Sequence, residues 1–469
     1  MDRKKRICSK RLIIDPGSFR DPSGFIFYVD NTVYRSVSEH GSHNYDLLKS
    51  SGFYDKAIRK NLLISHTEVN DFPDTVSAYK VLEPEKIEFI SYPYEWCFSQ
   101  LKDAALLTIR LQRQAIDSGF SLKDASAYNI QFKDGAPLFI DTLSFEPYRE
   151  GDPWVAYRQY CQHFLGPLAA MAFTHIDLIG LLRANLDGLN TRLVSRLLPV
   201  KTIFKFPLLT HIHMHAHSET THTKQSDRLD TVREKRFSRN AMHGLIDSLE
   251  SAVEGLSWEP ANTIWGDYYN DTNYSEQALA AKKDIVERLI HSAEPRDVWD
   301  LGANTGLFSR IASDRKIRTI AFDIDPAAVE KNYRKVRKEN EKFILPLVMD
   351  LANPSPGLGW DHAERQALVS RGPADLLLAL ALIHHLAISN NLPLRKIAET
   401  FSKLGQHLVI EFVPKSDSQV KRLLMTRENV FHEYHEAAFE SAFSEFFEII
   451  EKMPVQNSKR TIFWMRRKS

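Results

Sequence analysis

Cysteine is scarce in this chain, and the few cysteines are widely spaced. The 469 residues include Cys8, Cys97 and Cys161 and no others. An odd number of scattered thiols excludes the disulfide framework that holds small secreted domains together. No apolar run reaches the roughly 18 residues of a membrane-spanning helix, and no hydrophobic segment follows the basic N-terminal residues. We therefore expect a cytoplasmic protein without a membrane span.

An excess of either charge is also missing. The chain has 61 Lys and Arg against 60 Asp and Glu, a net charge of +1. No overall field attracts nucleic acid or a membrane surface, and we expect no nucleic-acid partner. With 43% hydrophobic and 26% charged residues, the composition is that of an ordinary globular protein. The length predicts two or three domains.

The stretch Val298–Phe308 combines a hydrophobic strand, a glycine loop and the start of a helix. Gly302 and Gly306 lack a Cβ, so the loop can turn tightly and bring its N–H groups close to a bound molecule. A P-loop is excluded because no Lys-Ser/Thr follows Gly306. A dinucleotide fingerprint is excluded because Asn304 stands where its second glycine belongs. What remains is Asp-x-Gly-x-x-x-Gly, which begins at Asp300.

Each of the next predicted strands is followed by polar residues. Asp323 follows Thr319–Phe322, Asp350 follows Phe343–Val348, and His384-His385 end the apolar run that begins at Asp375. Polar residues at the carboxyl ends of parallel strands form the ligand site of an open α/β sheet. A carboxylate about 20 residues after the glycine loop suits the two hydroxyls of a ribose, which favours Asp323. Asp325 has the alternative role of capping a helix that begins at Pro326.

These motifs resemble those of class I S-adenosylmethionine-dependent methyltransferases, whose glycine loop normally reads (Asp/Glu)-x-Gly-x-Gly-x-Gly. Asp-Leu-Gly-Ala-Asn-Thr-Gly, Phe-Asp-Ile-Asp-Pro, Ile-His-His-Leu and Ile-Glu-Phe-Val-Pro-Lys follow one another as in a bacterial subgroup that includes nodulation-associated methyltransferases. The resemblance implies an α/β fold with a Rossmann-like, seven-stranded, mostly parallel sheet whose last strands form an antiparallel hairpin. It also implies S-adenosylmethionine as the cofactor.

The resemblance assigns roles to several residues. The residues expected to hold the cofactor are Asp300, Gly302, Asn304 and Gly306 at the methionine end, Asp323 at the ribose, Asp350 at the adenine, and Tyr268 and Tyr274 in a lid. Asn304 departs from the family pattern, and it either narrows the loop or adds an amide contact. Tyr268 and Tyr274 have the alternative role of packing between domains.

The candidate general base is His384 or His385, because imidazole titrates near neutrality. The alternative is that one histidine caps the loop and the other only shapes the pocket. Glu411, Lys415 and Asp417 follow the next strand and are expected on the acceptor side. The Asn/Asp-Pro-Pro-Tyr/Phe signature of amino-group methylation is absent, which favours an oxygen acceptor. The nodulation resemblance suggests a glycan, a glycolipid or another small molecule as that acceptor.

A stretch in the N-terminal half resembles the catalytic loop of kinase-fold phosphotransferases. Asp124 and Asn129 have the Asp-x4-Asn spacing, and Asp141 follows a predicted hairpin at the position of the metal-binding aspartate. Leu122-Lys123 stands where the family has His-Arg, and no glycine-rich loop or Val-Ala-Ile-Lys strand precedes it. Three interpretations remain: an active phosphotransferase, a domain that keeps the pocket to recognise substrate, and a hairpin whose polar residues satisfy backbone turns.

We predict three segments: an α+β domain over 1–200 that is kinase-like or accessory, a helical connector over 201–257, and a methyltransferase domain over 258–469. His211, His213, His215 and His217 alternate within the connector. Alternating histidines suggest a metal, but no cysteine or carboxylate pair completes a site, so we expect none. Besides the methyltransferase, two hypotheses remain open: a phosphotransferase centred on the Asp124–Asp141 stretch, and a non-catalytic binding protein.

Overall fold

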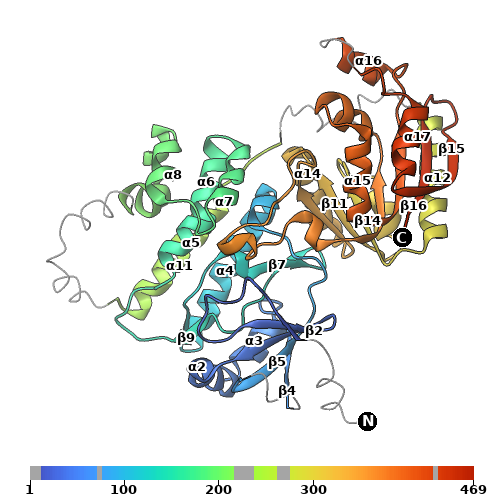
Figure 1. The fold of residues 1–469 in the computed structure, drawn as a ribbon. Coiled ribbons are helices and arrows are strands. Elements are labelled where there is room, and N and C mark those ends of the chain that lie inside the picture. Colours follow the sequence, from blue (N-terminus) through green and yellow to red (C-terminus); the bar gives the residue numbers. More distant parts are fainter. Residues whose placement is uncertain (1–11, 71–76, 216–236, 261–274, 426–430) are drawn as a thin grey trace. The chain divides into compact units, whose positions relative to one another are not determined.

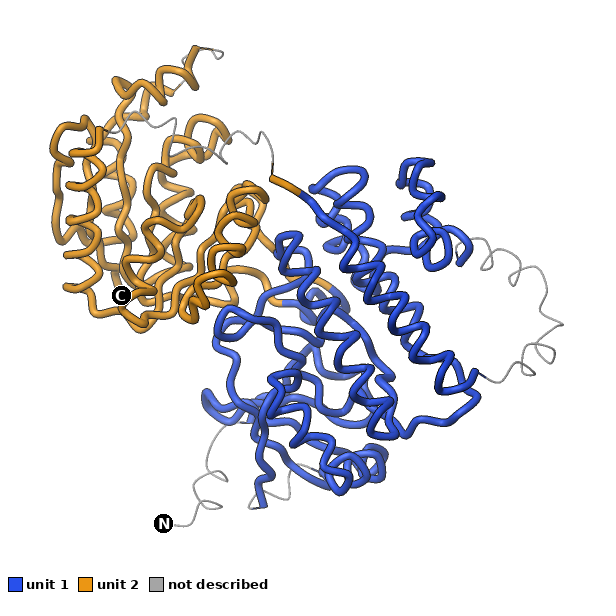
Figure 2. Tube along the Cα trace, turned by 180° about the vertical axis from the view of Figure 1, so that it is seen from behind, with its two compact units in different colours: residues 1–258, 359–365 blue, residues 259–358, 366–469 orange. Residues whose placement is uncertain are grey.

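The computed structural model describes residues 12–70, 77–215, 237–260, 275–425 and 431–469. The chain forms two compact units (Figure 2). Unit 1 consists of residues 1–258 and 359–365, and unit 2 consists of residues 259–358 and 366–469. The segment 201–257 therefore belongs to unit 1. Within the described ranges, no helix combines the length and the apolar character that crossing a membrane requires.

Unit 1 begins with a five-stranded antiparallel sheet in the order β1-β2-β3-β5-β4. The strands are β1 (Leu12–Ile14), β2 (Ile26–Val29), β3 (Thr32–Val37), β4 (His66–Val69) and β5 (Lys80–Pro84). The hairpin between β2 and β3 turns at Asp30, whose φ of 54° lies in the left-handed region that Asp tolerates. Two helices, α2 (Glu39–Ser50) and α3 (Phe53–Arg59), connect β3 to β4.

The rest of unit 1 is mainly helical (Figure 1). Two long helices, α4 (Phe98–Asp117) and α11 (Arg239–Glu254), pack against each other. Lys102 Nζ donates to the carbonyl oxygens of Glu254 and Leu256 at 2.9 and 2.6 Å, which fixes the end of α11.

The other elements of unit 1 are short. The strands are β6 (Phe120–Leu122), β7 (Ile130–Lys133), β8 (Ala136–Phe139) and β9 (Phe145–Pro147). The helices are α5 (Tyr157–Tyr160), α6 (Gly166–Phe173), α7 (Leu181–Ala184), α8 (Thr191–Leu197) and α9 (Phe206–Leu208). The tighter or wider helical turns are η1 (Pro93–Glu95), η2 (Ala127–Asn129), η3 (Cys161–Leu165), η4 (Ile176–Gly180), η5 (Val200–Phe204), η6 (Leu209–Met214) and η9 (Trp360–His362).

One segment of unit 1, Gly359–Arg365, lies between two parts of unit 2 in the sequence. Nε and one Nη of Arg20 donate to the two carboxylate oxygens of Glu364 at 3.0 and 2.6 Å. The Glu364 side chain is only 3% exposed. The guanidinium of Arg365 lies 4.1 Å from the ring centroid of Tyr128. Bidentate arginine–carboxylate pairs are geometrically specific, so these contacts hold the segment in one place within unit 1.

Unit 2 contains the predicted seven-stranded sheet, in the order β12-β11-β10-β13-β14-β16-β15. The strands are β10 (Asp297–Leu301), β11 (Arg318–Asp323), β12 (Ile344–Val348), β13 (Ala374–Ala379), β14 (Gly405–Phe412), β15 (Phe447–Pro454) and β16 (Thr461–Arg467). The first five pair in parallel, and β16 runs antiparallel to both β14 and β15. The order reverses between β10 and β13, and open α/β sheets bind ligands at such a switch point.

Helices cover both faces of this sheet, as continuous apolar strands require. The helices of unit 2 are α12 (Glu276–Ala293), α13 (Ser309–Ser313), α14 (Pro326–Glu339), α15 (Leu394–Leu404), α16 (Ser418–Leu424) and α17 (Glu436–Ser444), with short turns η10 (Leu368–Arg371) and η11 (His385–Ser389). Val286 and Leu289 of α12 pack with Val298 and Leu376 on one face. Residues alternate between faces along a strand. On the other face, Phe439 of α17 meets Phe463, with ring centroids 5.1 Å apart.

Candidate functional site

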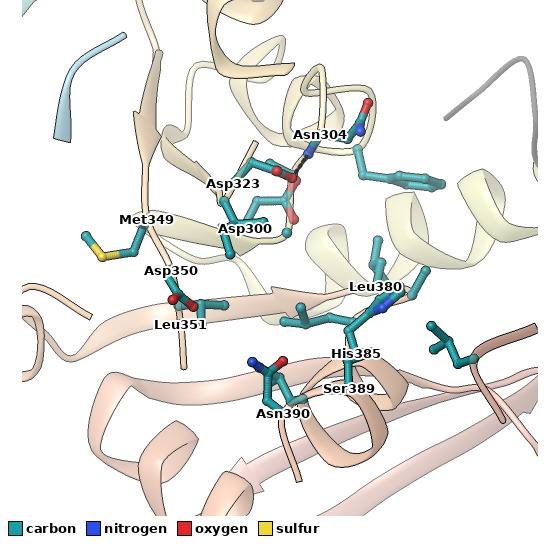
Figure 3. Close-up of a pocket in the computed structure, with 18 of the residues that line it drawn as sticks. Asp300, Asn304, Asp323, Met349, Asp350, Leu351, Leu380, His385, Ser389 and Asn390 are labelled. Atoms are coloured by element: carbon teal, nitrogen blue, oxygen red, sulfur yellow. Dashed lines mark hydrogen bonds between the residues drawn. The ribbon is translucent and has the colours of Figure 1, made fainter. Parts of the chain in front are cut away.

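A cavity of about 280 Å³ opens at the carboxyl ends of β10, β11, β12 and β13. Its volume is near the lower end of the range of about 300–1,000 Å³ for small-ligand pockets. The sequence-predicted residues that line it are Asp300, Gly302, Asn304, Asp323, Asp350 and His385. Figure 3 shows Asp300, Asn304 and Asp323 on one side of the cavity, and His385, Ser389 and Asn390 on the opposite side. The parallel strands bring these residues together because their carboxyl ends meet at one edge of the sheet.

The glycine loop after β10 turns through left-handed residues. The angle φ is 80° at Gly302, 51° at Asn304 and 79° at Gly306. Glycine adopts such angles without steric cost, and Asn is among the few other residues that tolerate them. Asn304 therefore stands at the second-glycine position of the family pattern in a glycine-like conformation. Its Oδ1 accepts the N–H of Thr305 at 2.9 Å, which adds local support to the turn.

The loop N–H groups bind the protein itself. Gly302 and Ala303 both donate to the carbonyl oxygen of Phe322, at 2.9 and 2.8 Å. This differs from the expectation that the loop presents these groups to a ligand, because they hold it against the end of β11. Gly306 lies outside the cavity lining. A Cβ at Gly306 would come within 2.5 Å of Arg310, so the glycine is needed for the close packing of the Arg310 side chain.

Asp323 connects the loop to the second strand. Its Oδ2 accepts the Asn304 N–H at 2.7 Å, and its Oδ1 accepts the Asp325 N–H at 2.8 Å. Burial raises the pKa of Asp323 to about 6, against the lowering effect of these backbone donors. Asp325 caps α14 instead, since its Oδ1 accepts the Ala327 N–H at 2.9 Å and Pro326 begins the helix.

Asp300 is a second buried acid of the same cavity. Its Oδ2 accepts a hydrogen bond from the Ser309 hydroxyl at 2.6 Å. Burial raises the pKa of Asp300 to about 7, and nearby Asp323 adds to the rise while Ser309 and Lys282 oppose it. Acids that titrate this close to neutrality in one cavity are typical of functional sites. A cationic ligand would favour the ionised form of both.

The part of the cavity next to β12 is more apolar. Asp350 lines it, and its Oδ1 accepts the Ala352 N–H at 2.8 Å. Met349, Leu351 and Ile324 also contribute to the lining. Figure 3 places Met349, Asp350 and Leu351 along one segment of chain. One carboxylate beside apolar side chains suits a flat ring with a polar edge.

The two adjacent histidines occupy different environments. His385 lines the cavity, whereas His384 is buried outside the lining. Their ring centroids are 4.1 Å apart. Burial lowers the pKa of His385 to about 4, with a further contribution from Arg460. Burial also lowers the pKa of His384, well below its usual value. Both imidazoles are therefore uncharged at neutral pH, and His385 is the one that lines the cavity.

Sequence reasoning missed Lys282, which lines the cavity from α12. Its Nζ donates to Glu411 Oε2 at 2.6 Å and lies 4.6 Å from the ring centroid of Phe308. Burial lowers the pKa of Lys282, and the Glu411 carboxylate opposes that shift. The spacing of Lys282 in the sequence could have identified it. It falls between Ala278 and Val286 on the buried face of α12. A lysine in an apolar helical stripe needs a partner.

The predicted acceptor-side residues lie outside the cavity lining. Glu411 Oε2 accepts from Lys282 and from the Ala381 N–H, the latter at 2.7 Å. Asp417 accepts from Arg460 Nε at 2.8 Å, and another nitrogen of Arg460 is 3.6 Å from Glu411. Lys415 Nζ donates to the carbonyl oxygen of Phe431. Glu411, Arg460 and Asp417 thus form, with Lys282, a network of buried charges beside the cavity. The remaining candidates, Tyr268 and Tyr274, lie outside the described residues.

The Asp124–Asp141 stretch lies in unit 1. Asp124 Oδ1 accepts the Ser126 N–H at 2.9 Å, as in an Asx turn. Asn129 follows at the end of η2, before the β7–β8 hairpin. Asp141 accepts from the Leu143 N–H at 3.1 Å and from the Ser144 hydroxyl at 2.5 Å. Its carboxylate also lies 3.0 Å from the guanidinium of Arg35 on β3. The acids of this stretch are engaged in local turns and in an ion pair.

Two histidines of the alternating run, His211 and His213, use both ring nitrogens within unit 1. His211 lies 2.8 Å from both Tyr157 and Ser248, and His213 lies 2.8 and 2.9 Å from the hydroxyls of Ser195 and Thr202. His217 lies outside the described residues. Across the described ranges, no cluster of three or more His, Cys, Asp or Glu is arranged to hold a metal.

Comparison with protein-family models found no match. Among curated proteins, the nodulation protein NoeA of Rhizobium meliloti (strain 1021) is 35% identical over 463 residues. The match covers 96% of this chain and 95% of that protein.

Solved structures give partial matches. The N-methyltransferase NodS from Bradyrhizobium japonicum WM9, in complex with S-adenosyl-L-homocysteine, is 15% identical with a TM-score of 0.32, over 45% of this chain and 95% of that chain. The magnesium protoporphyrin IX methyltransferase ChlM from Synechocystis PCC 6803, with bound S-adenosyl-L-homocysteine, is 16% identical with a TM-score of 0.30, over 43% and 91%. The kinase-methyltransferase WbdD is 15% identical with a TM-score of 0.30. That match spans 46% of this chain and 46% of WbdD, less than half of either.

The conformation of Asn304 predicts which substitutions unit 2 tolerates. Asn304→Gly should change the free energy of unfolding little, whereas Asn304→Val should cost about 1–3 kcal/mol because a β-branched residue is strained at φ of 51°. Denaturant unfolding followed by fluorescence measures both. Thr305→Val is the control, since Thr305 is already β-branched. Equal stability of the Gly and Val variants would contradict the prediction.

The Lys282–Glu411 pair predicts strong coupling. Lys282→Met removes the nearer of the two cations beside the buried Glu411 carboxylate and should destabilise the protein by about 3 kcal/mol. Adding Glu411→Gln should recover part of that loss, because neither charge then remains. Urea unfolding of both single variants and the double variant gives the coupling energy. Lys403→Met, which breaks an exposed lysine–glutamate pair on α15, should leave stability unchanged. Additive effects of Lys282→Met and Glu411→Gln would show that the pair is not coupled.

Proposed function

Because this chain belongs to the family of the nodulation protein NoeA and is an S-adenosylmethionine-dependent methyltransferase, we propose that it methylates an oxygen atom of its acceptor. The observation that carries the proposal is the cavity at the switch point of unit 2. Two buried carboxylates line one side of it and an uncharged imidazole lines the other. The first side suits a cationic cofactor, and the second suits a neutral hydroxyl.

The residues of the cavity fit the cofactor. Each oxygen of Asp323 accepts one of the backbone hydrogen bonds described above, whereas a carboxylate offers about four acceptor positions. The Ile324 N–H also hydrogen-bonds this carboxylate, which leaves Asp323 at least one acceptor position for a ribose hydroxyl. Asp350, beside Met349 and Leu351, would hold the adenine. Asp300 and the ammonium of Lys282 would hold the amino and carboxylate groups of the methionine end, which carry the complementary charges.

When bound, the cofactor would supply a methyl group on a sulfonium sulfur for transfer to an oxygen of the acceptor. The protein contributes orientation and the removal of a proton. His385 is uncharged above its pKa of about 4, so the unprotonated nitrogen of its ring would accept the hydroxyl proton.

The acceptor class that we propose is a glycan or a glycolipid. Ser389 and Asn390 line the cavity on the side of His385, and Figure 3 shows them close to it. A hydroxyl and an amide can each donate and accept, which suits an acceptor with several hydroxyl groups. Neither group carries a charge, so this wall offers no counter-charge to an ammonium acceptor.

Unit 1 would act as an accessory or substrate-recognising domain. The β3 cation is Arg35, and it pairs with Asp141. A metal-binding aspartate needs its oxygens for magnesium, and here an arginine and local turns already engage them. We therefore favour recognition over phosphotransfer.

Cofactor affinity should depend on pH. Asp323 and Asp300 have pKa values of about 6 and about 7, so both are largely ionised at about pH 8 and protonated at about pH 5. A cationic ligand binds the ionised forms, so affinity should fall as pH falls through this window, and binding should release protons. Titration calorimetry in buffers of different ionisation enthalpy measures both effects. An affinity independent of pH would contradict this assignment.

Titration calorimetry also distinguishes the contribution of Asp323 to cofactor affinity from that of Asp325. Asp323→Asn should weaken binding by about tenfold or more, which corresponds to about 1.4 kcal/mol. Asp325→Asn is the matched control, because Asn caps helices as well as Asp does. If Asp323→Asn and Asp325→Asn weaken cofactor binding equally, the assignment of Asp323 to the ribose is contradicted. Magnesium-dependent ATP binding that is lost in Asp141→Ala would instead support the phosphotransferase hypothesis.

If His385 is the base, replacing it should lower turnover without changing cofactor affinity. His385→Gln keeps a polar side chain but removes the base, so kcat should fall by about 10²–10⁴-fold with unchanged affinity for S-adenosylhomocysteine. Transfer of radiolabelled methyl groups to cell-envelope glycan and glycolipid fractions measures activity. His384→Gln is the control, because His384 lies outside the cavity lining. Full activity of His385→Gln would reject it as the base.

A further inference from the structure

The region Gly188–His215 of unit 1 exposes an unusual number of large apolar side chains. It contains α8, η5, α9 and η6. Phe204 is 87% exposed, Val200 75% and Phe206 71%. Leu193, Ile203 and Met214 are also exposed. Figures 1 and 2 both show this region at the end of unit 1 opposite α2 and the five-stranded sheet. We call these six side chains the α8–η6 surface.

The charges within this surface have one sign. Between Gly188 and His215 the sequence has no Asp or Glu, although acids and bases are balanced over the whole chain. Arg192, Arg196, Lys201 and Lys205 are exposed there and alternate with the apolar residues. Burial lowers the pKa of His211 to about 4 and also lowers that of His213, so these histidines stay uncharged at neutral pH. These two histidines therefore add no positive charge to that of the lysines and arginines.

Buried residues beneath the α8–η6 surface fix the backbone that carries it. Thr202, Leu208 and Ile212 are buried beneath it. The Thr202 hydroxyl donates to the Pro199 carbonyl at 2.7 Å and lies 2.9 Å from His213. The apolar side chains that face outward are therefore presented by a fixed backbone, which reduces the entropy lost on binding.

We propose that the α8–η6 surface docks unit 1 on the interfacial region of an anionic lipid bilayer. Apolar side chains enter the boundary between headgroups and acyl chains, while interleaved Lys and Arg side chains meet anionic headgroups. The aliphatic residues Val200, Ile203 and Met214 favour lipid over nucleic acid, because nucleic acids are bound by stacking on flat rings. The absence of acids favours an anionic surface over a protein with mixed charges. The inference stands independently of the acceptor proposed above.

Vesicle flotation of the full-length protein tests the proposal. Vesicles of phosphatidylcholine with about a third phosphatidylglycerol are compared with vesicles of phosphatidylcholine alone. The wild type should bind the anionic vesicles at least about tenfold more strongly, and binding should weaken as salt rises. Phe204→Ser/Phe206→Ser and Lys201→Glu/Lys205→Glu should each reduce binding about tenfold. The charge variant should also lose the salt dependence.

Matched control variants test whether the loss of any exposed apolar or cationic side chain reduces vesicle binding. Val155→Ser removes an exposed apolar side chain elsewhere in unit 1, and Lys56→Glu/Lys60→Glu reverses two exposed cations on and after α3. Both should bind vesicles like the wild type, and all variants should keep wild-type melting and S-adenosylhomocysteine affinity. Equal binding to both vesicle types, or equal losses in the controls, would overturn the proposal. So would a dimer that Phe204→Ser/Phe206→Ser dissociates, or single-stranded RNA binding without vesicle binding.

Discussion

The hydrogen bond from the Asn304 N–H to Asp323 is the contact on which the cavity depends. It joins the loop after β10 to the end of β11, and the other oxygen of Asp323 holds the turn into α14. One carboxylate thus sets the positions of a loop, a strand end and a helix start. The bond requires Asn304 to be left-handed, so backbone conformation and acid placement are parts of one arrangement. The opposite wall belongs to β13, because the strand order reverses beside β10.

Behind that wall, Lys282, Glu411, Arg460 and Asp417 form a buried group of two cations and two anions. Such pairs contribute little net stability compared with apolar packing, but removing one member is costly. Their effect here is positional. Glu411 on β14 binds the N–H of Ala381, a residue with φ of 54° at the start of the segment that carries His385. The network therefore connects α12, β14 and the turn before β16 to the turn that shapes the imidazole wall.

The sequence predicted the features that depend on local chemistry or on strand order. The parallel sheet with its antiparallel end and the cap at Asp325 follow from apolar runs and helix-start residues. It did not predict which groups the folded chain turns inward. Glu411 and Asp417 follow a strand as ligand residues do, yet they pair with Lys282 and Arg460, which are distant in sequence. His384 and His385 are adjacent, and only their burial distinguishes them. Likewise, a balanced net charge concealed the acid-free region around Phe204.

The segment Gly359–Arg365 has a consequence for how this protein can be divided. The chain passes from unit 1 to unit 2 after Trp258, returns at Gly359 and leaves again after Arg365. Neither unit is therefore encoded by one uninterrupted stretch of gene. A cut after Trp258 would leave Arg20 without Glu364, and the downstream fragment would carry a surface segment evolved for contacts that it no longer has. During synthesis, unit 1 also stays incomplete until the first three strands of the unit 2 sheet have been translated. Gene fusion and exchange would therefore move the two units together as one inherited piece.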